Sequence, residues 1–332
     1  MSAFTLTRRS ALIGMASTLA APAILRAASP YPSRQLSIVV PLATGGYNDR
    51  LARAFLTPLG TELGQNLIVV NRPGAGTVLG NTYFQQQPAD GYTLMCTNLP
   101  FIMLTIMGGN VPYKSDDFTV INIPSRDFSL VASAPSRGIN NIDEVFAKLK
   151  QDPSSVSIGL QPTSIDLVNT MLMVRGIGVD PAKLRLVTYD GAGPVRNAVL
   201  GGHVDIGVVA AEGYLTLKDR IRPLLIFDKV RSAEFPDAAS IVEIGEKFGF
   251  KGDYVDGAQR SWLVRTAFKN EHPEDYAKLI AAFKKVTTDP AVVSSLGTQE
   301  LESEWLGPEE SQAIYNRTFT NLQKYADLLK PA

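Results

Sequence analysis

A glycine loop that joins an apolar run to a helical pattern is the first segment whose residues could do chemistry. Residues 37–55 read SIVVPLATGGYNDRLARAF, in which Gly45 and Gly46 separate the apolar run from the helical spacing. A loop of this kind exposes backbone amides at a helix start, where anions bind. No nucleophile, metal-binding cluster or phosphate-binding lysine stands beside it. The pattern favours an anion-binding site without catalytic chemistry, and the alternative is an ordinary strand–turn–helix connection capped by Asn48 or Asp49.

A second glycine loop lies in the other half of the chain. Residues 187–207 read VTYDGAGPVRNAVLGGHVDIG, and Gly191 and Gly193 lead from an apolar run into a helix begun by Pro194. Each loop would present the free amides and the positive dipole end of a helix. Two such helix starts that face each other suit a small carboxylate.

The residue types that most enzymes need are scarce. The chain has two histidines, His203 and His272, and one cysteine, Cys96, which are too few for a zinc site or a Cys-His pair. No G-x-S-x-G elbow and no P-loop lysine motif occurs. We therefore expect no metal, no cofactor and no catalytic residue.

One segment imitates a dinucleotide-binding fingerprint. Residues 69–81 read VVNRPGAGTVLGN and place three glycines between a strand pattern and a helix pattern. Pro73 stiffens the turn that should wrap a pyrophosphate, and the next strand ends in Thr97 and Asn98, where an acid should bind the ribose. We interpret the segment as a tight turn into a helix.

Length and charge exclude some classes of protein. The 332 residues suit two domains, and 45% apolar with 19% charged residues is a globular composition. Lys+Arg and Asp+Glu both number 32, so neither a nucleic acid nor a membrane surface is indicated as a partner.

The N-terminus has the order of an export signal. Residues 7–28 read TRRSALIGMASTLAAPAILRAA: the pair Arg8-Arg9 precedes an apolar stretch without acids, and small residues follow. The paired arginines resemble a twin-arginine signal. We expect export to the periplasm and removal of residues 1–28, which takes three arginines from the 32 basic residues and leaves 29 against 32 acidic ones.

Apolar runs and helical spacings alternate through the rest of the chain. Runs of strand length occur at 36–40, 67–70, 93–96, 156–158, 186–188, 206–209 and 224–227. This alternation argues for parallel sheets and an α/β fold. Residues 118–134 read as a crossover strand between two such units, and 258–267 are a candidate for the return crossing. We expect lobe 1 to comprise 29–130 plus 257–332, lobe 2 to comprise 131–256, and a ligand cleft between them.

Five features span nearly all of the chain after residue 28: YPSRQLSIVVPLATGGYNDRLAR, ELGQNLIVVNRPGAGTVLGN, ADGYTL, GVDPAKLRLVTYDGAGPVRNAVLGGHVDIGV and a tryptophan, Trp262. Together they resemble the substrate-binding receptors of the tripartite tricarboxylate transporter family, also called Bug receptors. The resemblance implies a two-lobed periplasmic-binding-protein fold of type II, a Venus flytrap. It also implies that main-chain groups of both glycine loops hold the ligand carboxylate. By match, that role falls on Ala43, Thr44, Gly45, Gly46, Asp190, Gly191, Ala192 and Gly193.

The pocket side chains depart from that family. Relatives are glycine-rich with an Asp-His pair after the strand near residue 158, whereas residues 159–168 here read GLQPTSIDLV, with Asp166 and no histidine. We expect neutral hydrogen bonds from Gln161, Thr163 and Ser164. Further contacts are expected from residues beside the loops, at the end of the third strand and in the return crossing: Tyr47, Asp49, Thr97, Asn98, Tyr189 and Arg260.

These observations lead to one hypothesis and two alternatives. The hypothesis is an exported, monomeric receptor that captures a small organic carboxylate and docks on membrane permease subunits. Tyr47 and Phe101, both placed near the cleft mouth, favour an acid with an aromatic or otherwise apolar body over citrate. The alternatives are a periplasmic α/β enzyme that acts on a carboxylate, and a ligand sensor for a membrane kinase.

Overall fold

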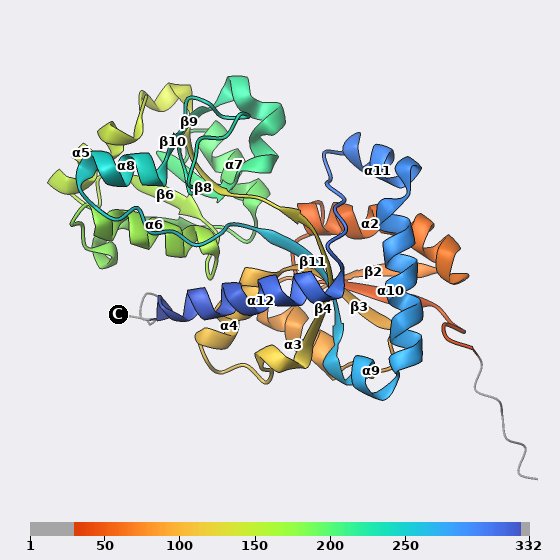
Figure 1. The fold of residues 1–332 in the computed structure, drawn as a ribbon. Coiled ribbons are helices and arrows are strands. Elements are labelled where there is room, and N and C mark those ends of the chain that lie inside the picture. The colour runs from red at the N-terminus through yellow and green to blue at the C-terminus, as the bar shows by residue number, and fades with distance from the viewer. Residues whose placement is uncertain (1–29, 327–332) are drawn as a thin grey trace, which may run out of the picture.

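The computed structural model describes residues 30–326. The predicted export signal lies outside the described residues. Two β-sheets, each covered by helices, form two lobes that are joined by extended crossings (Figure 1). Within residues 30–326, no helix is both long enough and apolar enough to cross a membrane.

Lobe 1 is built on a five-stranded sheet in the order β2-β1-β3-β11-β4. Its strands are β1 (Leu36–Val40), β2 (Leu67–Asn71), β3 (Thr93–Asn98), β4 (Phe118–Arg126) and β11 (Gln259–Arg265). β1 pairs in parallel with β2 and β3, whereas β11 pairs antiparallel with β3 and β4. The expectation of a parallel sheet is therefore wrong for β11, because this strand returns from lobe 2 and enters the sheet against the direction of its neighbours.

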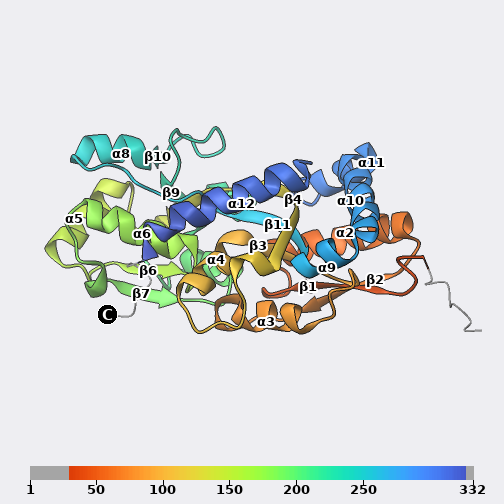
Figure 2. The ribbon, with the colours of Figure 1, turned by 60° about the horizontal axis from the view of Figure 1, so that its bottom comes forward.

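Helices cover both faces of this sheet (Figure 2). They are α2 (Tyr47–Leu63), α3 (Val78–Gln86), α4 (Leu99–Met107), α9 (Thr266–Glu271), α10 (Pro273–Thr288), α11 (Pro290–Gly297) and α12 (Gly307–Gln323). Ile38 and Val40 of β1 belong to the apolar core under α2 and α10, whereas Val39 belongs to the core under α3, α4 and α12. A strand that is covered on both faces is apolar at most positions, which is why a run interrupted only by the half-buried Ser37 predicted β1.

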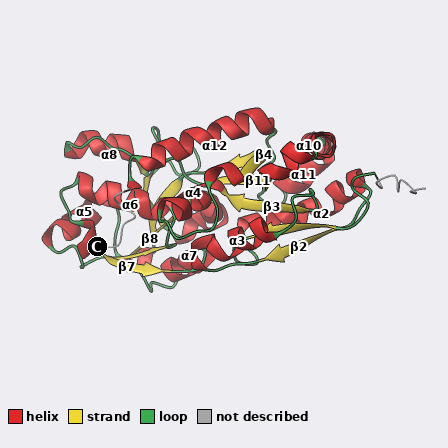
Figure 3. Cartoon of the chain, turned by 90° about the horizontal axis from the view of Figure 1, so that it is seen from below, coloured by secondary structure: helices red, strands yellow, loops and turns green. Residues whose placement is uncertain are grey.

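Lobe 2 has a six-stranded sheet in the order β10-β9-β5-β8-β6-β7. Its strands are β5 (Ser129–Ser133), β6 (Ser157–Leu160), β7 (Arg185–Thr188), β8 (Ile206–Ala210), β9 (Arg222–Ile226) and β10 (Ala239–Ser240). Its helices are α5 (Ile142–Gln151), α6 (Ile165–Gly176), α7 (Ala192–Leu200) and α8 (Ile241–Phe248), and a 3-10 segment, Ala211–Arg220, follows β8 (Figure 3). β5 runs antiparallel to β8 and β9, so this sheet is mixed as well.

The two crossings lie against each other between the lobes. The predicted crossover strand 118–134 is divided at Asp127 and Phe128, because β4 belongs to the first sheet and β5 to the second. The return crossing approaches at Gly257, and the Asp127 N–H donates to the Ala258 carbonyl at 2.9 Å. A Cβ at Gly257 would overlap the Asp127 carbonyl oxygen and would lie 2.8 Å from the Phe128 Cα. The absence of a side chain at residue 257 therefore allows the two backbones to approach this closely.

Helix α6 ties lobe 2 to lobe 1. Met173 belongs to the core of lobe 2, whereas Ile165 and Val168 belong to the core that contains α4 and α12 of lobe 1. Figure 2 shows α12 running from the side of α10 toward α6. Asn169 of α6 is fully buried and exchanges two hydrogen bonds with the backbone of Val255, at 2.8 and 3.0 Å. Because α6 is buried against two bodies, its apolar residues are not confined to one face.

The segment that imitates a dinucleotide fingerprint is a turn, as predicted. Ala75–Thr77 form a short 3-10 helix between β2 and α3. A Cβ on Gly80 would lie 2.7 Å from the Pro41 Cα, and one on Gly76 would lie 3.1 Å from the Thr163 Cβ of lobe 2. These glycines allow close packing against the first loop and against the other lobe.

We expect Gly257→Ala to destabilise the fold, because the added methyl group meets backbone atoms that cannot rotate away. Overpacking of this kind costs roughly 1–3 kcal/mol of unfolding free energy, which urea denaturation measures. Gly297→Ala is the matched control: its Cβ would meet no atom within 4 Å and Gly297 ends helix α11, so its stability should not fall and can rise by about 0.4–1 kcal/mol. Equal stability of the two variants would contradict the close approach of the crossings.

Candidate functional site

A cleft between the lobes collects both glycine loops. Its volume is about 440 Å³. The predicted residues that line it are Ala43, Thr44, Gly45, Gly46, Tyr47, Asn98, Phe101, Gln161, Asp190, Gly191, Ala192, Gly193 and Arg260. A larger hollow of about 780 Å³ lies beside α12 and the crossings, and none of the predicted site residues lines it. The cleft is therefore the candidate site.

Three helices begin at this cleft without a side-chain cap. Gly46 is the N-cap of α2 and Gly191 that of α7, and neither has a side chain that could satisfy the first-turn amides. Asn98 is the N-cap of α4, but its Oδ1 accepts a hydrogen bond from the Gln259 N–H at 2.7 Å instead of capping the helix. Free amides and the positive ends of three helix dipoles therefore meet at one cavity, an arrangement that favours an anion.

Asp49 shapes the first loop and does not line the cleft. Its buried carboxylate accepts hydrogen bonds from the Gly45 N–H at 2.8 Å, Arg53 Nε at 3.0 Å and Asn71 Nδ2 at 2.9 Å. Burial acts to raise the pKa of Asp49, but these hydrogen bonds outweigh it and hold the pKa below its usual value. Gly45 has a φ of +81°, which L side chains rarely adopt. The loop therefore depends on the Asp49 carboxylate and on a glycine at residue 45.

Four other predicted residues lie beside the cleft without lining it. The Ser164 side chain caps α6. Thr163 packs toward Gly76 of lobe 1. Thr97 is fully buried in β3, and Tyr189 packs against the apolar cluster at α7. Their side chains are used for capping and packing, so the structure gives them no contact with the cavity.

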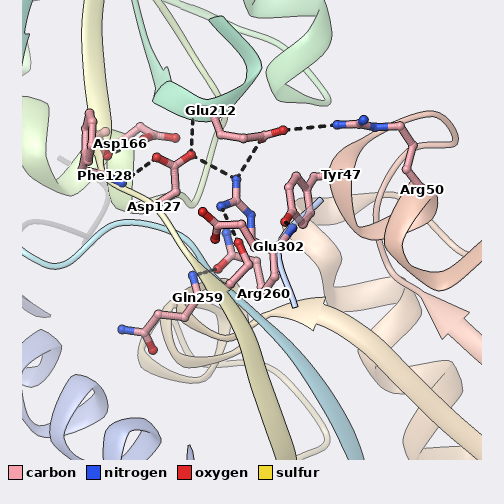
Figure 4. Close-up of polar contacts among 12 residues, drawn as sticks. Tyr47, Arg50, Asp127, Phe128, Asp166, Glu212, Gln259, Arg260 and Glu302 are labelled. Carbon is pink, nitrogen blue, oxygen red and sulfur yellow. Dashed lines mark hydrogen bonds and ion pairs between the residues drawn. The ribbon is translucent and has the colours of Figure 1, made fainter. Parts of the chain in front are cut away.

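Arg260 lines the cleft as part of a buried ion-pair network (Figure 4). Its Nη2 lies 3.2 Å from Asp127 Oδ2 and 3.4 Å from Glu212 Oε2, and its guanidinium lies 4.1 Å from the centroid of the Tyr47 ring. Arg50 reaches Glu212 from the other side at 3.2 Å. Burial acts to lower the pKa of Arg260, but the two acids outweigh it and raise the pKa. The charge of Arg260, which the sequence placed near the cleft, is therefore already compensated by Asp127 and Glu212.

This network joins parts of the chain that are far apart in sequence. Arg50 belongs to α2 and Arg260 to β11 of lobe 1, whereas Glu212 belongs to the segment after β8 in lobe 2. Asp127 lies in the crossing, and its Oδ2 also accepts the Glu212 N–H at 2.9 Å. Removal of one member of a buried ion pair costs about 3–5 kcal/mol, because the remaining charge stays buried.

Sequence reasoning missed four charged residues that line the cleft: Arg50, Arg196, Glu212 and Glu300. Arg50 and Arg196 each stand about one turn after an uncapped helix start, at Gly46 and Gly191. Helical side chains tilt toward the N-terminus, so this spacing was an available signal. Glu212 had no such signal, because only its tertiary contacts bring it to the cleft.

Cys96 and the metal-binding residue types of the described chain form neither a reactive thiol nor a metal-binding group. Burial raises the pKa of the Cys96 thiol to about 12, so the thiol stays neutral and is a poor nucleophile. In the described part of the chain, no three His, Cys, Asp or Glu side chains are grouped so that they could hold a metal ion.

Asp166 is buried at the start of α6 behind the cleft. Its Oδ1 accepts a hydrogen bond from Ser129 Oγ at 2.6 Å. Burial raises the pKa of Asp166 to about 7; repulsion by Asp127 adds to this effect, while Ser129 and Arg260 oppose it. An aspartate in an unfolded chain has a pKa of about 3.9. Between these two values the native state keeps a proton that the unfolded chain releases, so stability falls as the pH rises through this window.

We expect Asp166→Asn to remove this penalty. The gain in unfolding free energy over wild type should be small near pH 4, should grow by at most about 1.4 kcal/mol per pH unit, and should level off above about pH 7. Urea denaturation at several pH values measures it, and Asp219→Asn, at an exposed position, is the control. A gain that does not depend on pH would contradict a protonated Asp166 in the native protein.

Comparisons with known proteins agree with this architecture. Residues 51–324 match the family described as tripartite tricarboxylate transporter family receptor. The chain is 27% identical to Protein BugT of Bordetella pertussis (strain Tohama I) over 301 residues, which cover 89% of each chain. Its fold is similar to that of MatC from Rhodopseudomonas palustris with bound malate, at a TM-score of 0.74 and 21% identity over 90% of this chain and 100% of that chain. It is also similar to R. palustris Rpa4515 with adipate, at a TM-score of 0.73 and 21% identity over 90% and 98%. The family match covers most of the chain, so this protein belongs to the tripartite tricarboxylate transporter receptor family, as its five sequence features predict.

Proposed function

We propose that this protein is a periplasmic solute-binding receptor that captures a small organic carboxylate between its lobes and delivers it to membrane permease subunits. The observation that carries the proposal is the meeting of three uncapped helix N-termini, those of α2, α4 and α7, at one cavity. Free amides and helix dipoles bind an anion without a formal positive charge. Malate and adipate, named with the two similar structures, are carboxylates of suitable size.

The cleft side chains favour capture over catalysis. Of the described residues, none that lines the cleft is His, Cys or Ser. The Glu212 carboxylate forms ion pairs with Arg50 and Arg260, which hold it away from a free general-base role. A protein that holds an anion and does no chemistry on it acts as a receptor, so we propose no enzymatic activity.

The ligand that we propose is an acid with an aromatic or otherwise apolar body. Leu42, Tyr47 and Phe101 line the cleft with apolar surface. Arg260 is compensated by acids and is not available to a second or third ligand charge. Each buried charge of citrate would need its own compensation, which this cleft does not supply.

Our proposals on export, oligomeric state and lobe boundaries rest on the sequence. We propose that residues 1–28 are a twin-arginine export signal that is removed, and that the mature protein acts as a monomer without a nucleic-acid partner. Lobe 1 then comprises 29–130 plus 257–332 and lobe 2 comprises 131–256, with the two crossings as the hinge.

A melting screen tests the ligand class. We expect aliphatic or aromatic monoacids and diacids, such as hexanoate, benzoate and adipate, to raise the melting temperature more than citrate does. A ligand at 100 times its dissociation constant stabilises the fold by about 2.7 kcal/mol, which such a screen detects. If only sugars or amines stabilise the protein, the carboxylate proposal is wrong; if citrate alone does, the apolar-body proposal is wrong. A turnover assay on each hit tests the enzyme alternative.

Gly191→Val tests whether the glycine loops contact the ligand. Gly191 has an extended φ of 177°, which any residue adopts, and its Cβ would meet only Pro194 Cδ at 3.5 Å. The variant should fold normally and lose binding, because the side chain occupies space at the start of α7. Gly45→Val should also lose binding, but its positive φ adds backbone strain, so it is the less clean test. Normal binding by Gly191→Val would show that this loop is only a structural turn.

Small-angle scattering tests closure on the ligand. The cleft is lined from both lobes, so a ligand that touches both favours the closed arrangement over an open one. We expect a smaller radius of gyration when a stabilising acid from the screen is present. An unchanged radius would contradict ligand-driven closure around the crossings.

A further inference from the structure

Arg196 is a cleft arginine without an ionic partner. It lies in the second turn of α7 and lines the cavity. Arg50 and Arg260 both contact Glu212, but within residues 30–326 no acidic side chain forms an ion pair with Arg196. Burial lowers its pKa, and repulsion by Arg50 and Arg260 acts in the same direction. A guanidinium stays protonated even so, so the cleft contains a partly desolvated positive charge that an anion would stabilise.

The position of this guanidinium depends on a glycine in lobe 2. A Cβ on Gly213 would overlap the Arg196 guanidinium and would lie 2.8 Å from its Nε. The Arg196 side chain therefore lies against the bare backbone of Gly213, in the segment that follows β8. Because the φ of Gly213 is not in the left-handed region, its absent side chain matters here for space and not for backbone conformation.

The neighbours of Arg196 do not neutralise it. The Tyr214 hydroxyl is fully buried, and burial raises its pKa, so it carries no negative charge at neutral pH. Glu212 attracts Arg196 but already contacts two other arginines. The other acids that line the cleft, Asp190 and Glu300, are exposed. A ligand carboxylate is the partner that the surroundings of Arg196 lack.

We propose that Arg196, braced against Gly213, is the charge partner of one ligand carboxylate, and that the cleft therefore prefers monocarboxylic acids to diacids and triacids. The inference rests on the proposed carboxylate-binding function. In this proposal the Arg196 side chain holds the ligand together with the backbone donors of the glycine loops. A second carboxylate would gain no free arginine, because Arg50 already contacts Glu212 and Arg260 already contacts Asp127 and Glu212.

Isothermal titration calorimetry with matched acids tests both the role of Arg196 and the preference for monocarboxylic acids. Hexanoate and adipate have six carbons each and differ by one carboxylate, so wild type should bind hexanoate more tightly. Arg196→Gln should weaken hexanoate binding roughly 10- to 100-fold, the range expected for a lost hydrogen-bonded charge. The hexanoate affinity of Arg196→Lys should lie between those of wild type and Arg196→Gln, because lysine keeps the charge and loses the planar guanidinium. Arg222→Gln, at an exposed position, is the control and should bind as wild type does.

Gly213→Ala tests the brace without removing the charge. Its methyl group displaces the end of a flexible side chain and no backbone atom, so the variant should fold and should lose several-fold in hexanoate affinity. Equal hexanoate binding by wild type and Arg196→Gln would overturn the assignment of Arg196 and leave the proposed function intact. Tighter binding of adipate than of hexanoate would overturn the monocarboxylate preference. A wild type that binds none of the screened acids would overturn the proposed function itself.

Discussion

The buried charge of Arg260 is the constraint around which the two lobes are arranged. Its side chain is only 4% exposed, so its charge must be compensated inside the protein. Asp127 comes from the crossing, Glu212 from lobe 2 and the Tyr47 ring from the start of α2, directly after the first glycine loop. One guanidinium thus positions the crossing, the far lobe and the loop with respect to one another. Because Asp127 and Glu212 already compensate the charge of Arg260, the ligand must be held by other groups.

Those other groups are the starts of helices. Loops that end in Gly46 and Gly191 leave the first amides of α2 and α7 without caps, while Asn98 at the start of α4 bonds to Gln259 instead. Capping residues usually stabilise helix starts, so three uncapped starts at one cavity indicate amides kept available. Backbone donors that are fixed in direction need little reorganisation when an anion arrives.

The core shared by the lobes limits how the cleft can open. Ile165 and Val168 of α6 are buried with residues of α4 and α12 from the other lobe. Exposure of these side chains to water would cost free energy in proportion to their apolar area. The closure that we propose about the crossings should therefore keep α6 packed, as in domain movements where helices slide by small amounts.

The sequence by itself determined most of the strands and both glycine loops, because strand periodicity and turn glycines are local properties. The apolar run predicted at 36–40 is β1, and the loops predicted as anion sites do line one cleft. Only the tertiary structure decided which side chains face that cleft. Asp49 and Ser164 turn away to shape a loop and to cap a helix, whereas Arg196 turns inward. The partner of Arg50 stands 162 residues away, at Glu212. The direction of a side chain and the compensation of a buried charge depend on contacts between distant residues, which no local pattern in one sequence records.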